Sequence, residues 1–336
     1  MDSYPTVKVC AAHVAPAFLD AQATVAKAVA LIGQAAKAGA RLIAFPESFV
    51  PGFPIWASVQ APIKGHEFFR RIAANSIAVP GSEVDQICAA AHEHDIVVSI
   101  GISERSPASV GCLWNSNLLI GSDGNLLNHH RKLVPTFYEK LIWANGDGAG
   151  LTVCDTAIGK LGMLICGENT NPLARYALIA QGEQIHVSSY PPVWPTRPPN
   201  QAGRYDLAAA IRIRAGAHSF EGKVFNIVAS AFLDAATMAA LRCLDDEARE
   251  TLERSPRGVS MVLGPSGEVI SETLCDSEGL LYHTIDLADC VEPKQFHDVA
   301  GYYNRFDVFR LTVNRQRLTP ISLSKGEGGS DLANPT

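Results

Sequence analysis

The sequence lacks the features that mark membrane, secreted and nucleic-acid-binding proteins. No apolar run reaches the length of a membrane-spanning helix, and the N-terminal residues M-D-S-Y-P-T carry no basic-then-apolar signal pattern. Lys and Arg number 28 against 34 Asp and Glu, a net charge of −6, so the basic field that nucleic acids require is missing. We therefore expect a cytoplasmic protein without membrane or nucleic-acid partners.

Disulfide and metal-binding patterns are missing as well. The eight cysteines are scattered with no C-x-x-C pair, and the ten histidines contain no H-E-x-x-H pattern. His129 and His130 are adjacent, but no third ligand type stands in a metal-binding spacing with them. We expect free thiols, no metal and no cofactor.

Apolar residues are plentiful. They make up 47% of the 336 residues, against 18% charged residues, which is enough for a large core and for apolar subunit contacts. Predicted strands and helices alternate without a compositional break, which favours one α/β domain over residues 1–310 rather than two domains. Residues 311–336 are then a C-terminal tail, whose last part, from Ser324, has a composition typical of disorder.

The hydrophobic periodicity gives the order of the elements. The predicted strands cover residues 7–14, 42–45, 96–102, 115–120, 126 onward, 161–165, 184–189, 223–230, 259–263, 268–271 and 280–285. The predicted helices cover residues 20–37, 82–94, 172–182, 204–220 and, as one or two surface helices, 234–254.

The stretch from Lys160 to Gly182 predicts a strand, a tight turn and a helix. A short apolar run ends at Cys166, capping residue types follow, and Pro172 suits the first helical position. A thiol facing a helix N-terminus lies where the backbone dipole favours the thiolate, as a nucleophile requires. A cysteine in an apolar strand is more often a small core residue, so this position alone does not identify a nucleophile.

Three other charged residues stand at the ends of apolar segments. Glu47 follows residues 42–45, Lys132 follows the predicted strand from residue 126, and Glu139 comes seven residues later. Taken singly, Glu47 could cap the next segment, Lys132 could be a surface cation, and Glu139 could pair with Lys140.

Together these segments resemble the active-site motifs of the nitrilase superfamily. The matching segments are P-E-S-F-V-P-G-F-P, H-R-K-L-V-P-T-F-Y-E-K and L-I-C-G-E-N-T-N-P-L, in the family's order within residues 7–310, and L-I-W-A-N-G-D-G-A-G-L is similar to nitrilases proper. The resemblance implies that Glu47 is the general base, Lys132 the cationic stabiliser, Glu139 a second carboxylate and Cys166 the nucleophile. Such a site converts a nitrile and water into a carboxylic acid and ammonia through a thioimidate and an acyl-enzyme.

The residues after the cysteine indicate whether the enzyme attacks a nitrile or an amide. Amide-cleaving relatives usually have an aromatic residue and then Asp, whereas Glu168 favours a nitrilase. Gly167 replaces the commoner Trp, from which we expect more room beside the sulfur and bulkier or dinitrile substrates. The alternatives are an amide or carbamoyl hydrolase of the same superfamily, a cyanide-hydrolysing enzyme, or a catalytically silent relative that forms filaments or binds a ligand.

The candidate substrate-binding residues are mostly aromatic or proline residues in loops near the four polar residues, and ordinary packing is the alternative for each. Asn169 could bond near the sulfur, although capping of the following helix is the expected role. The set comprises Phe53, Trp56, Tyr138, Gly167, Asn169, Tyr190, Pro191 and Trp194.

The resemblance also implies the architecture. We expect a four-layer α-β-β-α sandwich with a C-terminal arm, assembled as a homodimer or a larger spiral homo-oligomer. The segment beyond Gly301 is rich in Arg, Tyr and Phe and is the expected intersubunit arm.

Overall fold

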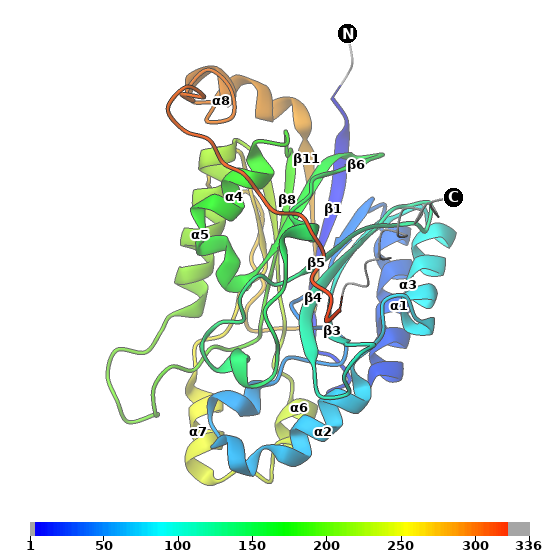
Figure 1. The fold of residues 1–336 in the computed structure, drawn as a ribbon, viewed down its shortest axis with the longest axis vertical. Coiled ribbons are helices and arrows are strands. Elements are labelled where there is room, and N and C mark those ends of the chain that lie inside the picture. Colours follow the sequence, from blue (N-terminus) through cyan, green and yellow to red (C-terminus); the bar gives the residue numbers. More distant parts are fainter. Residues whose placement is uncertain (1–3, 322–336) are drawn as a thin grey trace, which may run out of the picture.

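The computed structural model describes residues 4–321 and has four layers, two β-sheets face to face with helices on both outer sides (Figure 1). The strand orders are β11-β1-β2-β3-β4-β5 in one sheet and β10-β9-β8-β7-β6 in the other. This confirms the predicted α-β-β-α sandwich.

The six-stranded sheet combines parallel and antiparallel pairs. β1, β2 and β3 are parallel, and β4, β5 and β11 are antiparallel to their neighbours. The strand bounds are β1 Thr6–His13, β2 Leu42–Ala44, β3 Val97–Arg105, β4 Leu113–Ile120, β5 Leu126–Arg131 and β11 Gly279–Asp286. Helices α1 (Ala21–Lys37) and α3 (Ser82–Glu93) cover its outer face and bury their apolar sides against it.

The five-stranded sheet is parallel at its centre, where β7, β8 and β9 lie side by side. Its strands are β6 Cys154–Thr156, β7 Gly159–Ile165, β8 Ile185–Tyr190, β9 Phe225–Ser230 and β10 Met261–Leu263. Helices α4 (Pro172–Ile179) and α5 (Leu207–Gly222) cover its outer face. The described residues also form helices α2 His66–Asn75, α6 Ala235–Ala240, α7 Asp246–Arg254 and α8 Val291–Phe296.

The main core lies between the two sheets. Side chains from both inner faces meet there, among them Val9 and Ala44 from one sheet and Met163 and Ile227 from the other, all at most 1% exposed. Strands buried on both faces read as continuous apolar runs, which is why the sequence pattern located them well.

Most predicted elements are confirmed, with small shifts at their ends. The predicted strand at 268–271 is wrong: Val269 makes only an isolated bridge to Leu263. The elements α2, β6 and α8 were not predicted. Few apolar residues mark β6 and α8, whereas α2 carries a signal that was missed, the buried pair Phe68 and Ile72 at helical spacing. None of the helices that the structure describes is long and apolar enough to span a membrane.

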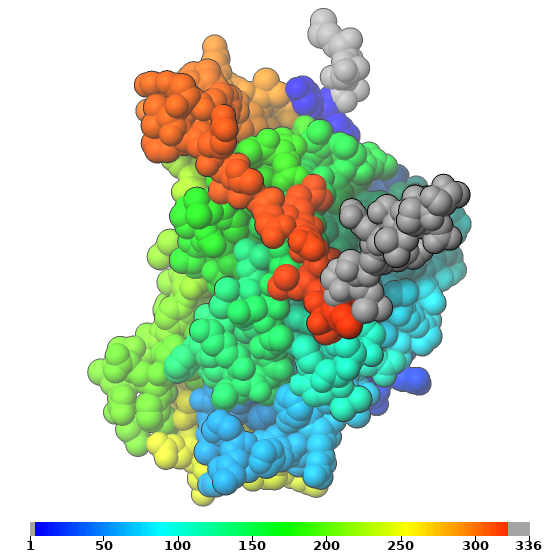
Figure 2. Space-filling model, viewed as in Figure 1, coloured from blue at the N-terminus to red at the C-terminus, as the bar shows by residue number. Residues whose placement is uncertain are grey.

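The chain beyond Gly301 crosses the molecule's own surface (Figure 2, orange to red). Arg317 donates to His129 O at 2.8 Å and pairs with Asp147, whose other carboxylate oxygen accepts from Leu318 N at 3.0 Å. Part of the expected intersubunit arm thus packs against its own subunit. The predicted disordered segment from Ser324 lies outside the described residues.

The sheets place the polar segment ends together. β2, β3 and β5 run in the same direction, because β3 and β5 are both antiparallel to β4. Their carboxyl ends therefore meet at one edge, where Glu47 and Lys132 follow β2 and β5. Cys166 follows β7 of the facing sheet.

Candidate active site

Cys166 lies on a sharp turn between β7 and a short 3-10 helix, Cys166–Thr170. Its φ of 48° lies in the left-handed region, which a non-glycine residue rarely adopts, and the residue is 3% exposed. The predicted strand–turn–helix is confirmed, but the 3-10 helix separates the cysteine from α4.

Glu47 is fixed from two sides. Its Oε1 accepts from Asn115 Nδ2 at 2.8 Å and from Lys132 Nζ at 2.7 Å. Its Oε2 is buried and has no partner among the described residues. Asn115, which the sequence reasoning missed as a site residue, enters from β4, and its only sequence signal was a polar side chain at the start of a predicted strand.

Lys132 is shared by two carboxylates. Its Nζ donates to both oxygens of Glu139, at 2.8 and 2.7 Å, and to Glu47. Glu139 belongs to the 3-10 helix Phe137–Leu141 and also accepts from Thr136 N at 2.9 Å. The three charged side chains are fully buried, so the pairing expected as an alternative between Glu139 and Lys140 is not formed.

The four polar side chains converge around the sulfur. A carboxylate oxygen of Glu47, one of Glu139 and Cys166 Sγ all lie within 4.8 Å of one another. Lys132 is held between the two carboxylates. Residues that are far apart in the sequence therefore form one compact group at the facing edges of the two sheets.

Burial controls the protonation of this group. Burial, followed by the nearby charge of Glu47, raises the pKa of the Cys166 thiol well above its usual value, against the opposing effect of Lys132. The cysteine therefore rests as a thiol, and the expectation that a helix dipole favours the resting thiolate is wrong. A short 3-10 turn faces the sulfur, and two carboxylates disfavour further negative charge.

Lys132 and Glu139 respond differently to the same environment. Burial disfavours the charge on Lys132, but Glu139 and Glu47 outweigh it and raise its pKa above the ordinary value. Burial raises the pKa of Glu139 to about 7, although Lys132 opposes the shift. The site thus holds a permanent cation beside a carboxylate that titrates near neutral pH.

Glu168 connects the segment that carries Lys132 to the segment that carries Cys166. Its Oε1 accepts from Leu133 N at 2.6 Å, next to Lys132, and its Oε2 accepts from Ile165 N at 2.9 Å, next to Cys166. His130 Nε2 bonds to the same carboxylate at 2.9 Å. Burial would raise the pKa of Glu168, but His130 and the two N–H groups lower it overall.

One expectation about the residues after Cys166 is wrong, and another stays a prediction. A Cβ at Gly167 would lie 2.6 Å from Thr136 Oγ1, so Thr136 takes up part of the space that a side chain would need, and the acceptance of bulkier or dinitrile substrates stays a prediction. Asn169 does not cap α4, because Asn171 Oδ1 accepts from Leu173 N at 3.0 Å. Instead the Asn169 amide is buried behind the turn, where Nδ2 donates to the carbonyl of Cys166 at 3.1 Å.

Several predicted wall residues pack in one aromatic cluster with Cys166. Tyr138 stacks on Trp194 with centroids 4.4 Å apart, and Phe53 lies 6.1 Å from Trp194. Trp143, not predicted, closes the cluster at 5.5 Å from Phe53. The hydroxyl of Tyr138 is buried without a partner among the described residues.

The remaining wall candidates differ in their surroundings. Trp56 stacks on Phe68 with centroids 5.0 Å apart, which is ordinary packing. Tyr190 is fully buried, and its hydroxyl lacks a partner within residues 4–321. Pro191 contributes its carbonyl, which accepts from Ser230 Oγ at 2.8 Å.

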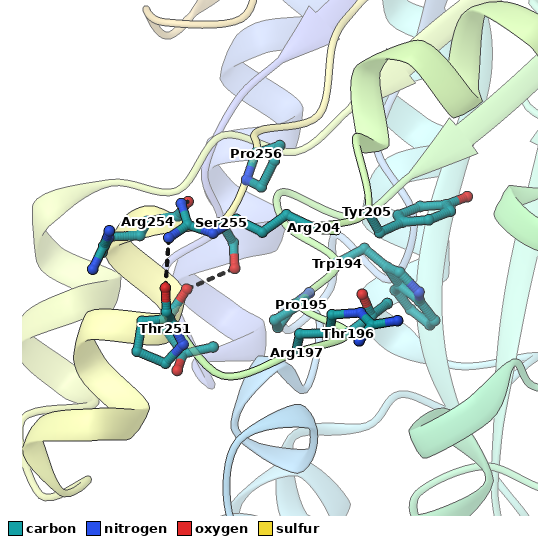
Figure 3. Close-up of a pocket in the computed structure, with 11 residues that line it drawn as sticks. Trp194, Pro195, Thr196, Arg197, Arg204, Tyr205, Thr251, Arg254, Ser255 and Pro256 are labelled. Carbon is teal, nitrogen blue, oxygen red and sulfur yellow. Dashed lines mark hydrogen bonds between the residues drawn. The ribbon is translucent and has the colours of Figure 1, made fainter. Parts of the chain in front are cut away.

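The loop after Trp194 borders two cavities. A small one lies between the loop and the end of α7 (Figure 3). A larger, more open one is lined by Phe137, which neighbours Tyr138, and by Pro195, which neighbours Trp194. The stacked Tyr138–Trp194 pair therefore lies next to residues that line the larger cavity.

Two buried groups have ligand types close enough to consider a metal ion: Glu47, Glu139 and Cys166, and a second set of Glu183, His186 and His218. In the first, the ammonium of Lys132 lies between the carboxylates and would repel a cation. The geometry of the second set is described below.

Comparisons with known proteins identify the family of this chain. The family model for carbon–nitrogen hydrolases matches residues 8–295. An aliphatic nitrilase of Rhodococcus rhodochrous is 35% identical over 320 residues, 94% of this chain and 85% of that one. A nitrilase of Pseudomonas syringae pv. syringae is 36% identical over 310 residues, 92% of this chain and 90% of that one.

Solved structures share the fold. Saccharomyces cerevisiae Nit3, a member of branch 10 of the nitrilase superfamily, matches with a TM-score of 0.66 at 18% identity and covers 87% of this chain and 94% of its own. The NitFhit protein of C. elegans matches with a TM-score of 0.69 at 17% identity, covering 95% and 69%.

Proposed function

This chain belongs to the carbon–nitrogen hydrolase family, and from that membership we propose that it is a nitrilase, which converts an organic nitrile and water into a carboxylic acid and ammonia. The observation that carries the proposal is a full-length likeness to several nitrilases together with a buried thiol beside two carboxylates and an ammonium. Glu47, Lys132, Glu139 and Cys166 are the proposed catalytic residues.

The first step is attack of the thiol on the nitrile carbon. Because the Cys166 thiol is protonated at rest, its proton must leave as the S–C bond forms. Glu47 Oε2, buried and unpartnered within the described chain, is the proposed acceptor of that proton. The proton then passes to the nitrile nitrogen, giving a thioimidate.

Charge develops on that nitrogen during the attack. The ammonium of Lys132 is fixed by three hydrogen bonds to carboxylate oxygens, so it can stabilise the charge without reorganising. Glu139 is the proposed residue that holds this ammonium in place.

Two water molecules complete the reaction. The first adds to the thioimidate carbon, and the C–N bond breaks to release ammonia and leave an acyl-enzyme. The second, activated by Glu47, adds to the acyl carbon, and the S–C bond breaks to release the carboxylic acid and return the thiol. The sum is one nitrile and two waters to one acid and one ammonia.

The activity is tested by measuring ammonia and acid from aliphatic, aromatic and dinitrile substrates, alongside the corresponding amides and cyanide. Cys166→Ala should abolish turnover, whereas Cys243→Ala, at an exposed cysteine, should keep it. Faster release from amides than from nitriles would favour an amidase, and formate from cyanide would favour a cyanide-hydrolysing enzyme. A Cys166→Ala protein with most of its activity would contradict the proposal.

We also propose that the enzyme is a homo-oligomer. Exposed apolar side chains lie on the outer helices, including Leu173 at 62% and Ile213 at 73%, and continue onto the C-terminal segment at Tyr303 and Phe309. Truncation after Gly301 should reduce the mass measured by light scattering. An unchanged mass would refute the role of this segment.

A further inference from the structure

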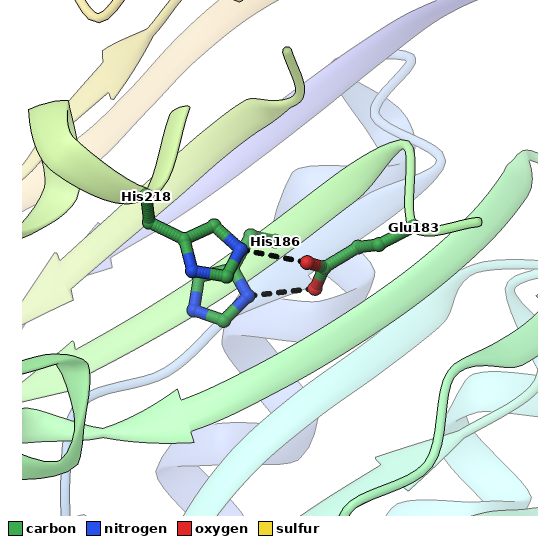
Figure 4. Close-up of side chains that lie close together, drawn as sticks. All are labelled: Glu183, His186 and His218. Carbon is green, nitrogen blue, oxygen red and sulfur yellow. Dashed lines mark hydrogen bonds and ion pairs between the residues drawn. The ribbon is translucent and has the colours of Figure 1, made fainter. Parts of the chain in front are cut away.

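Behind the Cys166 turn lies a second buried polar network, outside the four proposed catalytic residues. Glu183 precedes β8, His186 lies in β8 and His218 comes from α5 (Figure 4). Glu183 Oε1 is 2.7 Å from His186 Nδ1, and Oε2 is 2.7 Å from His218 Nε2. The two imidazole rings stack with centroids 3.8 Å apart, and all three residues are fully buried.

These distances describe hydrogen bonds rather than a metal site. A zinc ion holds its ligand atoms at about 2.0–2.2 Å, which keeps them roughly 3 Å or more from each other. The facing atoms of Glu183 and the two histidines are 2.7 Å apart, and each carboxylate oxygen is already paired with one ring nitrogen.

The network reaches the nucleophile through Asn169. Asn169 Nδ2 donates to the carbonyls of Leu164 at 3.3 Å and Cys166 at 3.1 Å. Two carbonyl acceptors fix the orientation of this amide, so its Oδ1 must face His186 Nε2, 3.0 Å away, and Ser188 Oγ, 3.1 Å away.

This orientation determines the protons on His186. An amide oxygen only accepts, so Nε2 donates to Asn169, and Nδ1 donates to the Glu183 carboxylate. His186 therefore carries both ring protons and a positive charge, which Glu183 balances. His218, which stacks on His186, is neutral because burial lowers its pKa to about 4. The Arg175 cation donates to the backbone oxygen of Asn169 at 2.8 Å.

We propose that Glu183 and His186 are positioning residues that hold Asn169, and through its amide the positive-φ turn of Cys166, in the geometry that the reaction needs. The charge of Glu183 keeps the second proton on His186, and that proton orients Asn169. While Nδ1 donates to the Glu183 carboxylate, loss of that second proton would leave His186 Nε2 and Asn169 Oδ1 as two acceptors facing each other. The inference rests on the proposed function for its kinetic readout.

Glu183→Gln tests the first link. It preserves size but removes the charge that balances a cationic His186, so the bond from Nε2 to Asn169 Oδ1 is no longer charge-assisted, and the neutral ring can adopt the tautomer in which Nε2 has no proton. Because a small displacement of a reacting group lowers rate more than binding, kcat should fall about 10-fold to 100-fold with KM nearly unchanged. Alkylation of Cys166 by iodoacetamide, followed on its own peptide by mass spectrometry, should slow in parallel.

A second substitution should rescue the first. In Glu183→Gln/His186→Gln, the glutamine Nε2 can take the place of His186 Nε2 and donate to Asn169 Oδ1 without any charge. This double variant should recover most of the kcat lost in Glu183→Gln. Glu183→Gln/His186→Asn is the matched control, because asparagine reaches only the position of Nδ1 and should recover nothing.

Glu104→Gln controls for the loss of a buried carboxylate. Glu104 is also 1% exposed, also bonds an imidazole at 2.7 Å and also has a pKa lowered to about 2, but it does not contact the Cys166 turn. The Glu104→Gln variant should have a lower melting temperature and a kcat within about threefold of the wild-type value. Equal losses of kcat in Glu104→Gln and Glu183→Gln, or no difference between the two double variants, would overturn the proposal.

Ser188→Ala keeps the test decisive if Glu183→Gln does not fold. It removes only the second donor to Asn169 Oδ1, so kcat should fall about twofold to fivefold. An unchanged kcat would contradict the proposed positioning of Asn169. The alkylation rate of Cys166 does not depend on the substrate, so a wild-type protein inactive on nitriles would refute the proposed function without deciding the positioning role.

Discussion

Arg131 and Lys132 are neighbours in the chain, yet they enter two buried clusters with opposite properties. Arg131 pairs with Glu104, which also accepts from His129 and from Ser116 Oγ. Lys132 is shared by two carboxylates in the cluster of Cys166, where Glu47 Oε2 has no partner among the described residues.

The protonation of the two clusters follows from this difference. Hydrogen bonds from His129 and Arg131 outweigh burial and lower the pKa of Glu104 to about 2. Burial raises the pKa of Glu139 to about 7 despite Lys132. Both oxygens of each carboxylate are hydrogen-bonded, so the contrast comes from charge: Glu139 shares the Lys132 ammonium with Glu47, whose charge adds to the effect of burial in raising its pKa.

Removing each cation gives the largest expected contrast. Lys132→Met should lower kcat/KM at least about 1,000-fold, because the developing charge loses its stabilising ammonium. Arg131→Met should retain activity within about fivefold while lowering the free energy of unfolding by about 3–5 kcal/mol, the cost of breaking a buried pair. Ammonia release and denaturant unfolding measure the two effects. Similar activity losses in both variants would remove the distinction between the clusters.

The pH dependence of stability separates the clusters next. Glu104 has a lowered pKa in the folded state, so its contribution is present above about pH 4.5 and is lost as the pH falls toward 2. Glu139 has a raised pKa, so its contribution is present below about pH 4.5 and is lost as the pH rises through 7.

Urea unfolding between pH 3 and pH 8 tests these opposite signs. Glu104→Gln should remove a rise in stability on the order of 2 kcal/mol between pH 3 and neutral pH. Glu139→Gln should flatten the decline in the free energy of unfolding as the pH rises toward 7. A Glu139→Gln protein that loses stability more steeply than wild type as the pH rises would contradict the assignment.

Glu168 joins the segment of Lys132 to that of Cys166, so its loss should affect rate more than folding. In Glu168→Gln one carboxylate oxygen becomes an amide donor and cannot accept from both Leu133 N and Ile165 N. We expect kcat to fall about 10-fold to 50-fold with little change in KM. Glu278→Gln, at a half-exposed ion pair with Lys27, is the control and should change neither constant.

The smallest effect is expected at Gly167. In Gly167→Ala the new Cβ meets Thr136 Oγ1, and we expect a loss of about 1–2 kcal/mol from overpacking. Thr136→Ala removes that atom, so the two substitutions together should cost less than their sum. Strict additivity of the melting shifts would show that Thr136 does not limit the space at this position.

The sequence by itself determined the residue types, their order and most of the elements. Apolar runs marked the buried strands, and three motifs that resemble those of the nitrilase superfamily identified Glu47, Lys132, Glu139 and Cys166 as candidates. These signals are local, because they depend on periodicity and on residues that stand next to each other in the chain.

The tertiary structure alone decided which partners those residues have. Asn115 reaches Glu47 from β4, and the Glu183–His186 pair reaches Asn169 from the neighbouring strand β8, so no spacing in the sequence announces them. Glu168 stands beside Cys166 in the chain, but its bond to Leu133 N exists only in the fold. The same holds for the thiol of Cys166, whose protonation depends on burial and on carboxylates brought near by strand pairing. Contacts between distant segments are set by the packing of whole sheets, and a linear pattern carries no record of them.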